Sequence, residues 1–307
     1  MIVNLLIFVV SLIVLLKASD YFVEAAEKIG LNLGIPQFIV GATIIAFGTS
    51  LPELASSIAS IYIGESEIVV GNVIGSNIAN ILLVLGIVAF FGKQIILNIR
   101  VRDVEIPLLI ASALFLWFML KDQHFSITEA IILIAALVIF LLNSIKGENT
   151  EPSQKKSKTE GKTIFLLLIS ALFVYLGAKY TIDSIKEISL HFGISTNIIA
   201  LTVVAFGTSL PELIVSLSAI KKGNTSMAIG NVIGSNIFNS FAVMSIPRLF
   251  GELEIPAGVV DFSLPFMLCI TILLGFICVS HKISRWEGAI MVILYVFYII
   301  ETMKFAA

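Results

Sequence analysis

The chain has 307 residues, of which 58% are hydrophobic and only 13% charged, and its formal net charge is −2. Soluble globular domains normally contain about 25% charged residues, so this composition excludes an ordinary water-soluble protein. Apolar runs long enough to cross a hydrocarbon core of roughly 30 Å recur along the chain. We therefore expect a polytopic membrane protein.

The first predicted element, residues 3–28, has neither a basic region at its start nor a small-residue cleavage site. We interpret it as a retained transmembrane helix rather than a signal peptide. Nine more apolar segments follow, so the predicted fold class is an all-α membrane protein with ten transmembrane helices. The later helices are predicted near 36–62, 67–91, 104–121, 126–146, 163–189, 195–220, 226–249, 258–280 and 286–304.

The second predicted helix contains the sequence GTSLPE, in which Pro52 has no N–H and clashes with the carbonyl of Gly48. We expect the helix to kink or unwind there and to free backbone carbonyls, which a bilayer tolerates only inside the protein or beside a polar cavity. The hydroxyls of Thr49 and Ser50 and the carboxylate of Glu53 lie next to these carbonyls in the sequence. All are hard oxygen donors, which suit Ca²⁺ or Na⁺.

The third predicted helix contains the sequence GNVIGSNIAN, which ends at Asn80. Asn72, Ser76 and Asn80 are spaced four residues apart, so they form one polar stripe along the helix. Gly71 and Gly75 form a small-xxx-small pattern, which lets a neighbouring helix approach closely.

After the fifth predicted helix comes a strongly polar segment, which we interpret as a flexible linker over 147–162. The second half then repeats the first: between Ala46–Asn80 and Ala205–Asn239, 21 of 35 positions are identical at a constant offset of 159. The repeated donors and packing residues are Thr208, Ser209, Pro211, Glu212, Gly230, Gly234, Ser235 and Asn239.

An odd number of helices per repeat places the second copy in the membrane upside down relative to the first. We therefore predict two inverted five-helix repeats, an arrangement typical of secondary transporters with a site near the membrane midplane. The predicted division is a first repeat over 1–146 with its motif at 41–80, the linker over 147–162, and a second repeat over 163–307 with its motif at 200–239.

The distribution of lysine and arginine predicts the orientation. Loops on the side of the linker contain thirteen of these residues, whereas loops on the side of the N-terminus contain four. We therefore predict a multi-pass protein of the cell membrane, with a cytoplasmic linker and both termini extracellular.

Simpler interpretations exist for several of these features. A Gly-Pro kink is commonly structural, a small-xxx-small pattern often serves packing alone, and Asn77 and Asn236 are equally consistent with hydrogen bonds across helices. A glutamate at the midplane differs, because burying its charge costs several kcal/mol unless it is compensated. Cys269 and Cys278 share one apolar segment, and the three histidines are scattered, so we expect neither a soft-metal site nor a catalytic triad.

The duplicated GTSLPE and GNVIGSN motifs resemble the alpha repeats of the sodium/calcium exchanger family, within the cation/calcium antiporter superfamily. The ten-helix layout extends the resemblance over nearly the whole chain. The resemblance implies a central site that binds Ca²⁺ or several Na⁺ in alternation, with no catalytic residue and no cofactor other than these transported ions. The ligands it implies are the carboxylates of Glu53 and Glu212, oxygens of Thr49, Ser50, Ser76, Thr208, Ser209 and Ser235, the carbonyls of Ala46 and Ala205, and the side chains of Asn80 and Asn239.

One position departs from part of the family. Potassium-dependent relatives have an aspartate where this chain has Asn239, so K⁺ co-transport is disfavoured. Proton-coupled relatives usually have a further acid in the motif that begins Gly-Asn, whereas residues 71–75 here contain none. This difference disfavours H⁺ as the main counter-ion.

We therefore predict a monomeric secondary active antiporter that exchanges Na⁺ for Ca²⁺ by alternating access. Its expected partners are the two ions and the lipid bilayer, with no nucleic acid. Ca²⁺/H⁺ antiport is the alternative within transport, and a passive cation channel is another. An intramembrane hydrolase using Ser50 or Ser209 is disfavoured, because no base and orienting group are apparent and an enzyme gains little from a duplicated site.

Overall fold

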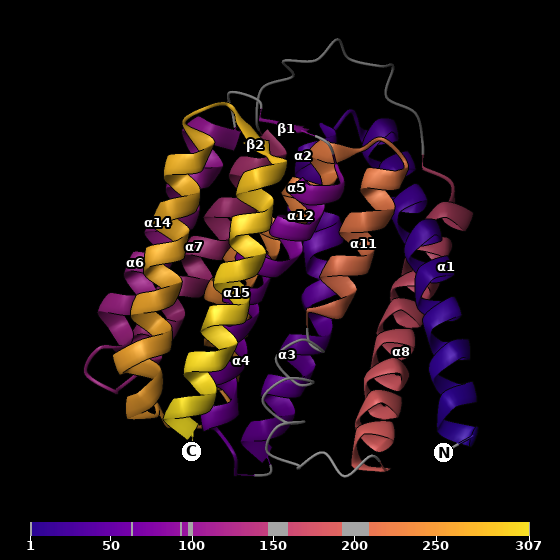
Figure 1. Cartoon of the computed structure of the whole chain (residues 1–307). Helices are drawn as coiled ribbons and strands as arrows, with labels where there is room; N and C mark the ends of the chain where they lie inside the picture. Colours follow the sequence, from indigo (N-terminus) through magenta and orange to yellow (C-terminus); the bar gives the residue numbers. More distant parts are fainter. Residues whose placement is uncertain are drawn as a thin grey trace.

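The computed structural model describes residues 2–62, 64–92, 94–97, 101–146, 159–191 and 209–306, and most of them are helical (Figure 1). The α-helices are α1 (Ile2–Leu33), α2 (Gln37–Val40), α3 (Ala46–Tyr62), α4 (Glu67–Ala79), α5 (Leu85–Phe91), α6 (Ile106–Leu120), α7 (Ile127–Lys146), α8 (Gly161–His191), α11 (Leu210–Lys221), α12 (Thr225–Phe238), α13 (Ser245–Arg248), α14 (Leu264–Cys278) and α15 (Arg285–Ala306). Five π-helical turns join or extend them: η1 (Gly41–Ile45), η2 (Asn80–Val84), η3 (Val101–Glu105), η5 (Asn239–Val243) and η6 (Val259–Ser263).

The described residues contain nine helical stretches that are long and apolar enough to cross a membrane. Their bounds follow the prediction closely: for example, 37–62 and 67–91 are observed where 36–62 and 67–91 were expected. The predicted span 195–220 lies partly outside the described residues, and its described end is α11. The chain is thus a multi-pass membrane protein, and nine of the ten expected spans are observed in the described part.

A short two-stranded sheet is the one departure from an all-helical chain in the described part. Strands β1 (Gln94–Ile96) and β2 (Lys282–Ser284) pair antiparallel, with Ile95 opposite Ile283 and both side chains buried. The sheet joins the segment after α5 to the segment before α15. We did not expect it, because three-residue strands have no detectable periodicity.

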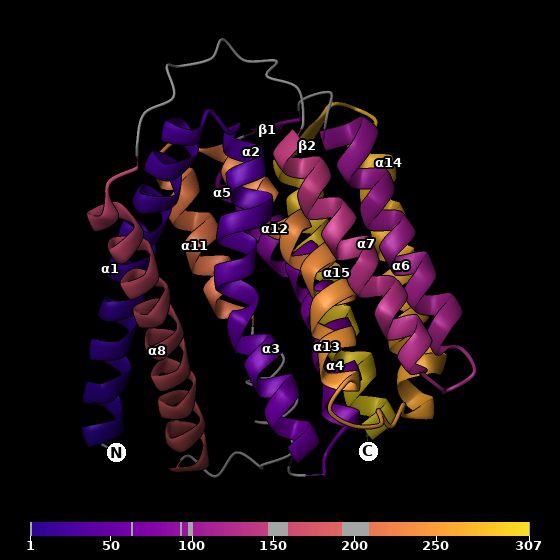
Figure 2. The ribbon, with the colours of Figure 1, turned by 180° about the vertical axis from the view of Figure 1, so that it is seen from behind.

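Helices α1 and α8 form an outer pair at one side of the bundle, opposite α6, α7 and α14 (Figures 1 and 2). They run antiparallel: the Thr181 hydroxyl bonds Ser11 at 2.9 Å near one end, and the Lys28 ammonium lies 3.8 Å from a Glu160 carboxylate oxygen at the other. The first helices of the two halves therefore have opposite directions, as an inverted repeat requires.

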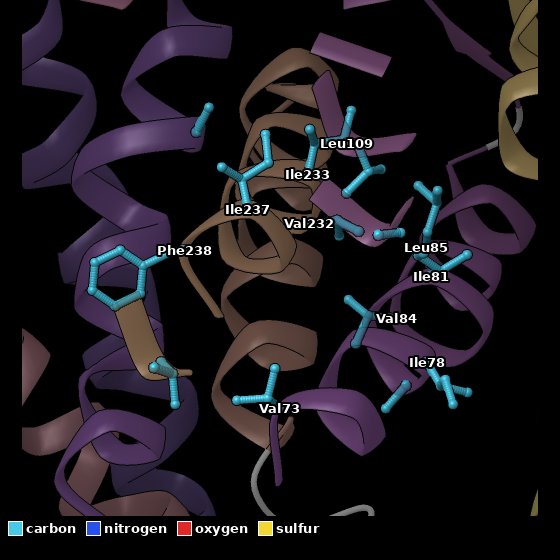
Figure 3. Packing of buried hydrophobic residues seen from close by; sticks show 14 of the residues in the cluster. Val73, Ile78, Ile81, Val84, Leu85, Leu109, Val232, Ile233, Ile237 and Phe238 are labelled. Atoms are coloured by element: carbon cyan, nitrogen blue, oxygen red, sulfur yellow. The ribbon is translucent and has the colours of Figure 1, made fainter. Parts of the chain in front are cut away.

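The core of the bundle is formed by α4, η2 and α5 from the first half and α12 from the second. Every residue from Met227 to Phe238 on α12 is buried. Figure 3 shows branched side chains from these elements packed together, including Ile81 and Val84 of η2 and Val232 of α12, with Leu109 of α6. This packing holds the polar stripes of the two halves at fixed positions.

Close approach of α12 to the first half depends on glycine. A Cβ added at Gly230 would collide with the carbonyl of Phe38 on α2, and one added at Gly234 would collide with the carbonyl of Ala42 on η1. The small-xxx-small prediction is therefore confirmed for this helix. For Gly71 and Gly75 on α4, no described atom lies within 4 Å of an added Cβ.

Candidate functional site

Glu53 on α3 and Glu212 on α11 are each at most 1% exposed. The two helices are in contact. The hydroxyl of Ser50, three residues before Glu53 and so on the same side of α3, donates a hydrogen bond to Oε1 of Glu212 at 3.3 Å. The two carboxylates, one from each repeat, therefore belong to one buried polar region.

Asn80 and Asn239 occupy equivalent places in the two halves. Each is fully buried and begins a π-helical turn, η2 after α4 and η5 after α12. Each turn contacts the glutamate helix of the other half, because η2 packs against α11 and η5 against α3. Isolated π-turns within α-helices are frequent at functional sites, and here they bring both predicted asparagines toward the two glutamates.

Thr49 connects the two halves through its hydroxyl. This oxygen lies 3.3 Å from the carbonyl of Ala46, 3.2 Å from Oδ1 of Asn231 and 3.4 Å from the hydroxyl of Ser235. A threonine has one hydroxyl proton, so these contacts are alternatives for donation, and Ser235 can also donate to Thr49. All four residues are buried.

The remaining predicted donors are placed as follows. Ser76 is buried on α4 and donates to Oδ1 of Asn72 at 3.4 Å, which confirms the expected polar stripe. Ser209 is buried at the N-cap of α11. Ala205 and Thr208 lie outside the described residues.

Several oxygens of this region have no hydrogen-bond partner among the described residues. They include both carboxylate oxygens of Glu53, Oε2 of Glu212, the hydroxyl of Ser209, and the amide oxygens of Asn80 and Asn239. Buried polar atoms are normally paired, because leaving them unpaired is unfavourable by several kcal/mol. Carboxylate, hydroxyl and amide oxygens gathered in this way fit a hard cation such as Ca²⁺ or Na⁺.

No group of three or more histidine, cysteine, aspartate or glutamate residues able to hold a metal occurs in the part of the chain that the structure describes. Two carboxylates alone cannot supply the six to eight oxygens that Ca²⁺ takes. A cation here must therefore also use neutral oxygens, which the hydroxyls and amides provide.

Two predictions about this region need correction. Of the predicted kink or unwinding at Pro52, the unwinding is wrong, since α3 continues from Ala46 to Tyr62 with this proline in its interior, and the kink stays a prediction. Asn236 does not bond across helices, because its amide donates to the carbonyl of Val232 on its own helix at 2.7 Å. Asn77 does bond across, to the hydroxyl of Ser240 at 2.9 Å.

Asn231 was missed as a member of this region. It is buried, accepts from Thr49, and donates toward the main chain of Glu212 at 3.4 Å. The constant offset of 159 relates it to Asn72, which the polar stripe did single out. Applying the repeat to every stripe residue would have found it.

Two buried carboxylates, one from each half of a duplicated membrane bundle and surrounded by neutral oxygens, define a membrane cation-transport protein. The family model described as sodium/calcium exchanger protein matches residues 3–146 and 162–303. The chain belongs to this family.

Individual relatives agree with this assignment. The sodium/calcium exchanger MaX1 of Methanosarcina acetivorans is 36% identical over an alignment that covers 97% of this chain and 98% of the relative. A solved structure of the sodium-calcium exchanger NCX_Mj, soaked with 10 mM Na⁺ and no Ca²⁺, matches at 34% identity with a TM-score of 0.86, covering 97% of this chain and 98% of that one. A sodium/potassium/calcium exchanger of Mus musculus is 34% identical over 40% of this chain and 11% of its own length.

Proposed function

We propose that this chain is a secondary active antiporter that exchanges Na⁺ for Ca²⁺ at one central site by alternating access. The observation that carries the proposal is the pair of buried glutamates, one per repeat, with unpartnered carboxylate oxygens and a hydrogen bond from Ser50 to Glu212 across the repeats. The names of the related exchangers support Na⁺ and Ca²⁺ as the two substrates.

The proposed ligands are the twelve residues named from the motifs. The carboxylates of Glu53 and Glu212 supply the charge. The neutral oxygens come from Thr49, Ser50, Ser76, Asn80, Thr208, Ser209, Ser235 and Asn239 and from the carbonyls of Ala46 and Ala205. No further cofactor is needed for this exchange.

Competition for these oxygens couples the two fluxes. Two carboxylates neutralise one Ca²⁺ or share several Na⁺, but the same oxygens do not hold both loads at once. Without a cation, two like charges would repel each other in a medium of low dielectric constant, which disfavours the crossing of an unloaded site. Exchange is therefore favoured over leak.

The same proposal includes the membrane arrangement. The excess of lysine and arginine on the linker side supports a cytoplasmic linker and extracellular termini in the cell membrane. The N- and C-termini lie at the same end of the bundle (Figure 1), as this topology requires. We expect the monomer, organised as two repeats joined by the linker over 147–162, to be the transport unit.

The deciding experiment is uptake of radiolabelled Ca²⁺ into proteoliposomes that contain the purified protein. One set of vesicles is loaded with Na⁺ and diluted into Na⁺-free buffer, and a matched set carries only a pH gradient. We expect uptake that requires internal Na⁺ and stops when the Na⁺ gradient is dissipated by an ionophore.

Each alternative gives a different pattern. Uptake driven by the pH gradient alone identifies Ca²⁺/H⁺ antiport and contradicts the proposal. Uptake that follows membrane voltage with neither gradient identifies a channel. Adding K⁺ to the external buffer together with Ca²⁺ tests co-transport, and we expect no change in rate because position 239 is an asparagine.

A further inference from the structure

Two asparagines outside the predicted ligand set make nearly the same contacts in the two halves. Nδ2 of Asn72 lies 3.3 Å from the main-chain oxygen of Glu53 and 3.0 Å from the hydroxyl of Ser57. Nδ2 of Asn231 lies 3.4 Å from the main-chain oxygen of Glu212 and 2.9 Å from the hydroxyl of Ser216. Both therefore join the glutamate helix of a repeat to the helix that follows it.

An asparagine is well suited to these contacts. Its amide nitrogen has two N–H donors, one for the carbonyl and one for the hydroxyl, and its oxygen remains free to accept. In the first half that oxygen accepts from Ser76 at 3.4 Å, and in the second it accepts from Thr49 at 3.2 Å. Each amide thus also holds a hydroxyl that belongs to the predicted ligand set.

The position of the held carbonyl matters, because it belongs to the same residue as the site carboxylate. The oxygen of the same amide accepts from a ligand hydroxyl, that of Ser76 in the first half and that of Thr49 in the second. A contact that fixes Asn72 against Glu53 therefore also fixes how far the Ser76 hydroxyl lies from the main chain of Glu53. The same holds for the second half.

We propose that Asn72 and Asn231 are positioning residues that set the size of the cation site. Each clamps the main chain of one site glutamate to the neighbouring helix and so fixes the spacing between that glutamate and the ligand hydroxyl that the same amide holds. This inference rests on the proposed cation site, but it does not depend on which counter-ion drives transport.

The clamp predicts an effect on cation size as well as on affinity. Ca²⁺ binds oxygens at about 2.3–2.6 Å, and Ba²⁺ needs longer distances. Removing a group that hydrogen-bonds to a metal ligand and orients it typically weakens metal affinity by about 10- to 100-fold. Loosening the clamp is expected to weaken Ca²⁺ binding more than Ba²⁺ binding.

The test uses purified full-length protein in detergent and in proteoliposomes. In Asn72→Leu and Asn231→Leu, a side chain of similar size replaces the amide without adding charge. Apparent Kd values for Ca²⁺ and Ba²⁺ come from fitting the rise in melting temperature with free cation concentration to the stabilisation RT ln(1 + [L]/Kd). We expect the Kd for Ca²⁺ to rise about 10-fold or more in both variants, the Kd for Ba²⁺ to rise less, and the KM of exchange to rise with the Kd.

Milder variants keep the test decisive if a leucine variant does not fold. Ser57→Ala and Ser216→Ala each remove one acceptor of the clamp, and we expect a Ca²⁺ Kd raised by about 3-fold, as for a weakened single hydrogen bond. In the double variant Asn72→Leu/Ser57→Ala, the rise in the Ca²⁺ Kd should equal that of Asn72→Leu alone, because the amide that Ser57 bonds is already absent.

Asn77→Leu is the matched control, because this asparagine lies on the same helix but bonds Ser240 rather than the glutamate helix. We expect it to lower the melting temperature without changing the ratio of Ca²⁺ to Ba²⁺ affinity. If the clamp variants lower only the melting temperature or the yield, with the affinity ratio unchanged, or if Asn77→Leu changes that ratio equally, the inference is wrong. Absence of Ca²⁺ stabilisation in the unmodified protein would instead contradict the proposed function.

Discussion

The nine residues AFGTSLPEL occur twice, and the described parts of the two copies differ in local structure at the serine, Ser50 in one and Ser209 in the other. All nine residues of the first copy lie within α3, with Pro52 in the helix interior. In the second copy, helix α11 begins at Leu210, with Ser209 as its N-cap and Pro211 in its first turn. Since the letters are identical, the difference comes from the surroundings and not from local preference.

The difference changes the electrostatic setting of the two carboxylates. Glu212 lies in the first turn of α11, where the partial positive charge of a helix N-terminus stabilises an anion. Glu53 lies more than one turn inside α3 and has no such support. Two chemically identical ligands therefore contribute to one site from unequal environments.

The largest expected effect comes from removing either charge. Glu53→Gln and Glu212→Gln should each reduce Na⁺-driven Ca²⁺ uptake by about 100-fold or more, because the affinity of calcium sites depends strongly on the number of charged ligands. Radiolabelled uptake in proteoliposomes measures this. The exposed Glu67→Gln on α4 is the control and should behave as the unmodified protein. Calcium flux retained in only one of the two variants would mean that the halves are not equivalent ligands.

How far the sequence predicts this molecule differs between the helices and the site. The spans and the pairing of the two motifs followed from hydropathy and from the constant offset, because both depend on side-chain composition alone. The continuous helix through Pro52 could not be predicted in this way, because packing of η1 and α3 against α12 overrides the local preference of proline. Sequence patterns also could not predict the contacts of Asn231 or the pairing of β1 with β2, since each joins residues far apart in sequence.

The second prediction concerns the hydroxyl that connects the halves. Thr49→Val removes the contacts with Asn231 and Ser235 while preserving the shape of the side chain. We expect the KM for Ca²⁺ to rise about 10-fold, since a ligand oxygen and an interhelical hydrogen bond are lost together. Thr208→Val makes the same change in the other copy of the motif. Similar KM values for the two variants would indicate that the repeats act symmetrically despite their different helix starts.

The third prediction compares glycines at equivalent positions of the repeats. Gly234→Ala places a methyl group against the backbone of Ala42, so we expect a loss of about 1–3 kcal/mol in stability from overpacking. Gly75→Ala meets no described atom within 4 Å and should be neutral, or stabilising by up to about 1 kcal/mol through helix propensity. Thermal unfolding in detergent, followed by circular dichroism, measures both. A comparable loss in the two variants would mean that Gly75 is as tightly packed as Gly234.

The smallest expected effect separates the two prolines. Pro52 lies inside α3, where a proline removes one backbone hydrogen bond and crowds the preceding turn, so Pro52→Ala should raise stability by about 1 kcal/mol. This is less than the full penalty of about 3 kcal/mol for an interior proline, because the surrounding bundle already accommodates it. Pro211 lies in the first turn of α11, where the N–H has no intrahelical acceptor, so Pro211→Ala should change stability by less than about 0.5 kcal/mol. Melting temperatures of the two variants, measured without Ca²⁺ and Na⁺, test this comparison. Equal shifts would mean that the helix start at Leu210 does not distinguish the second copy energetically. A rise in melting temperature confined to Pro52→Ala would tie the structural difference to this one residue.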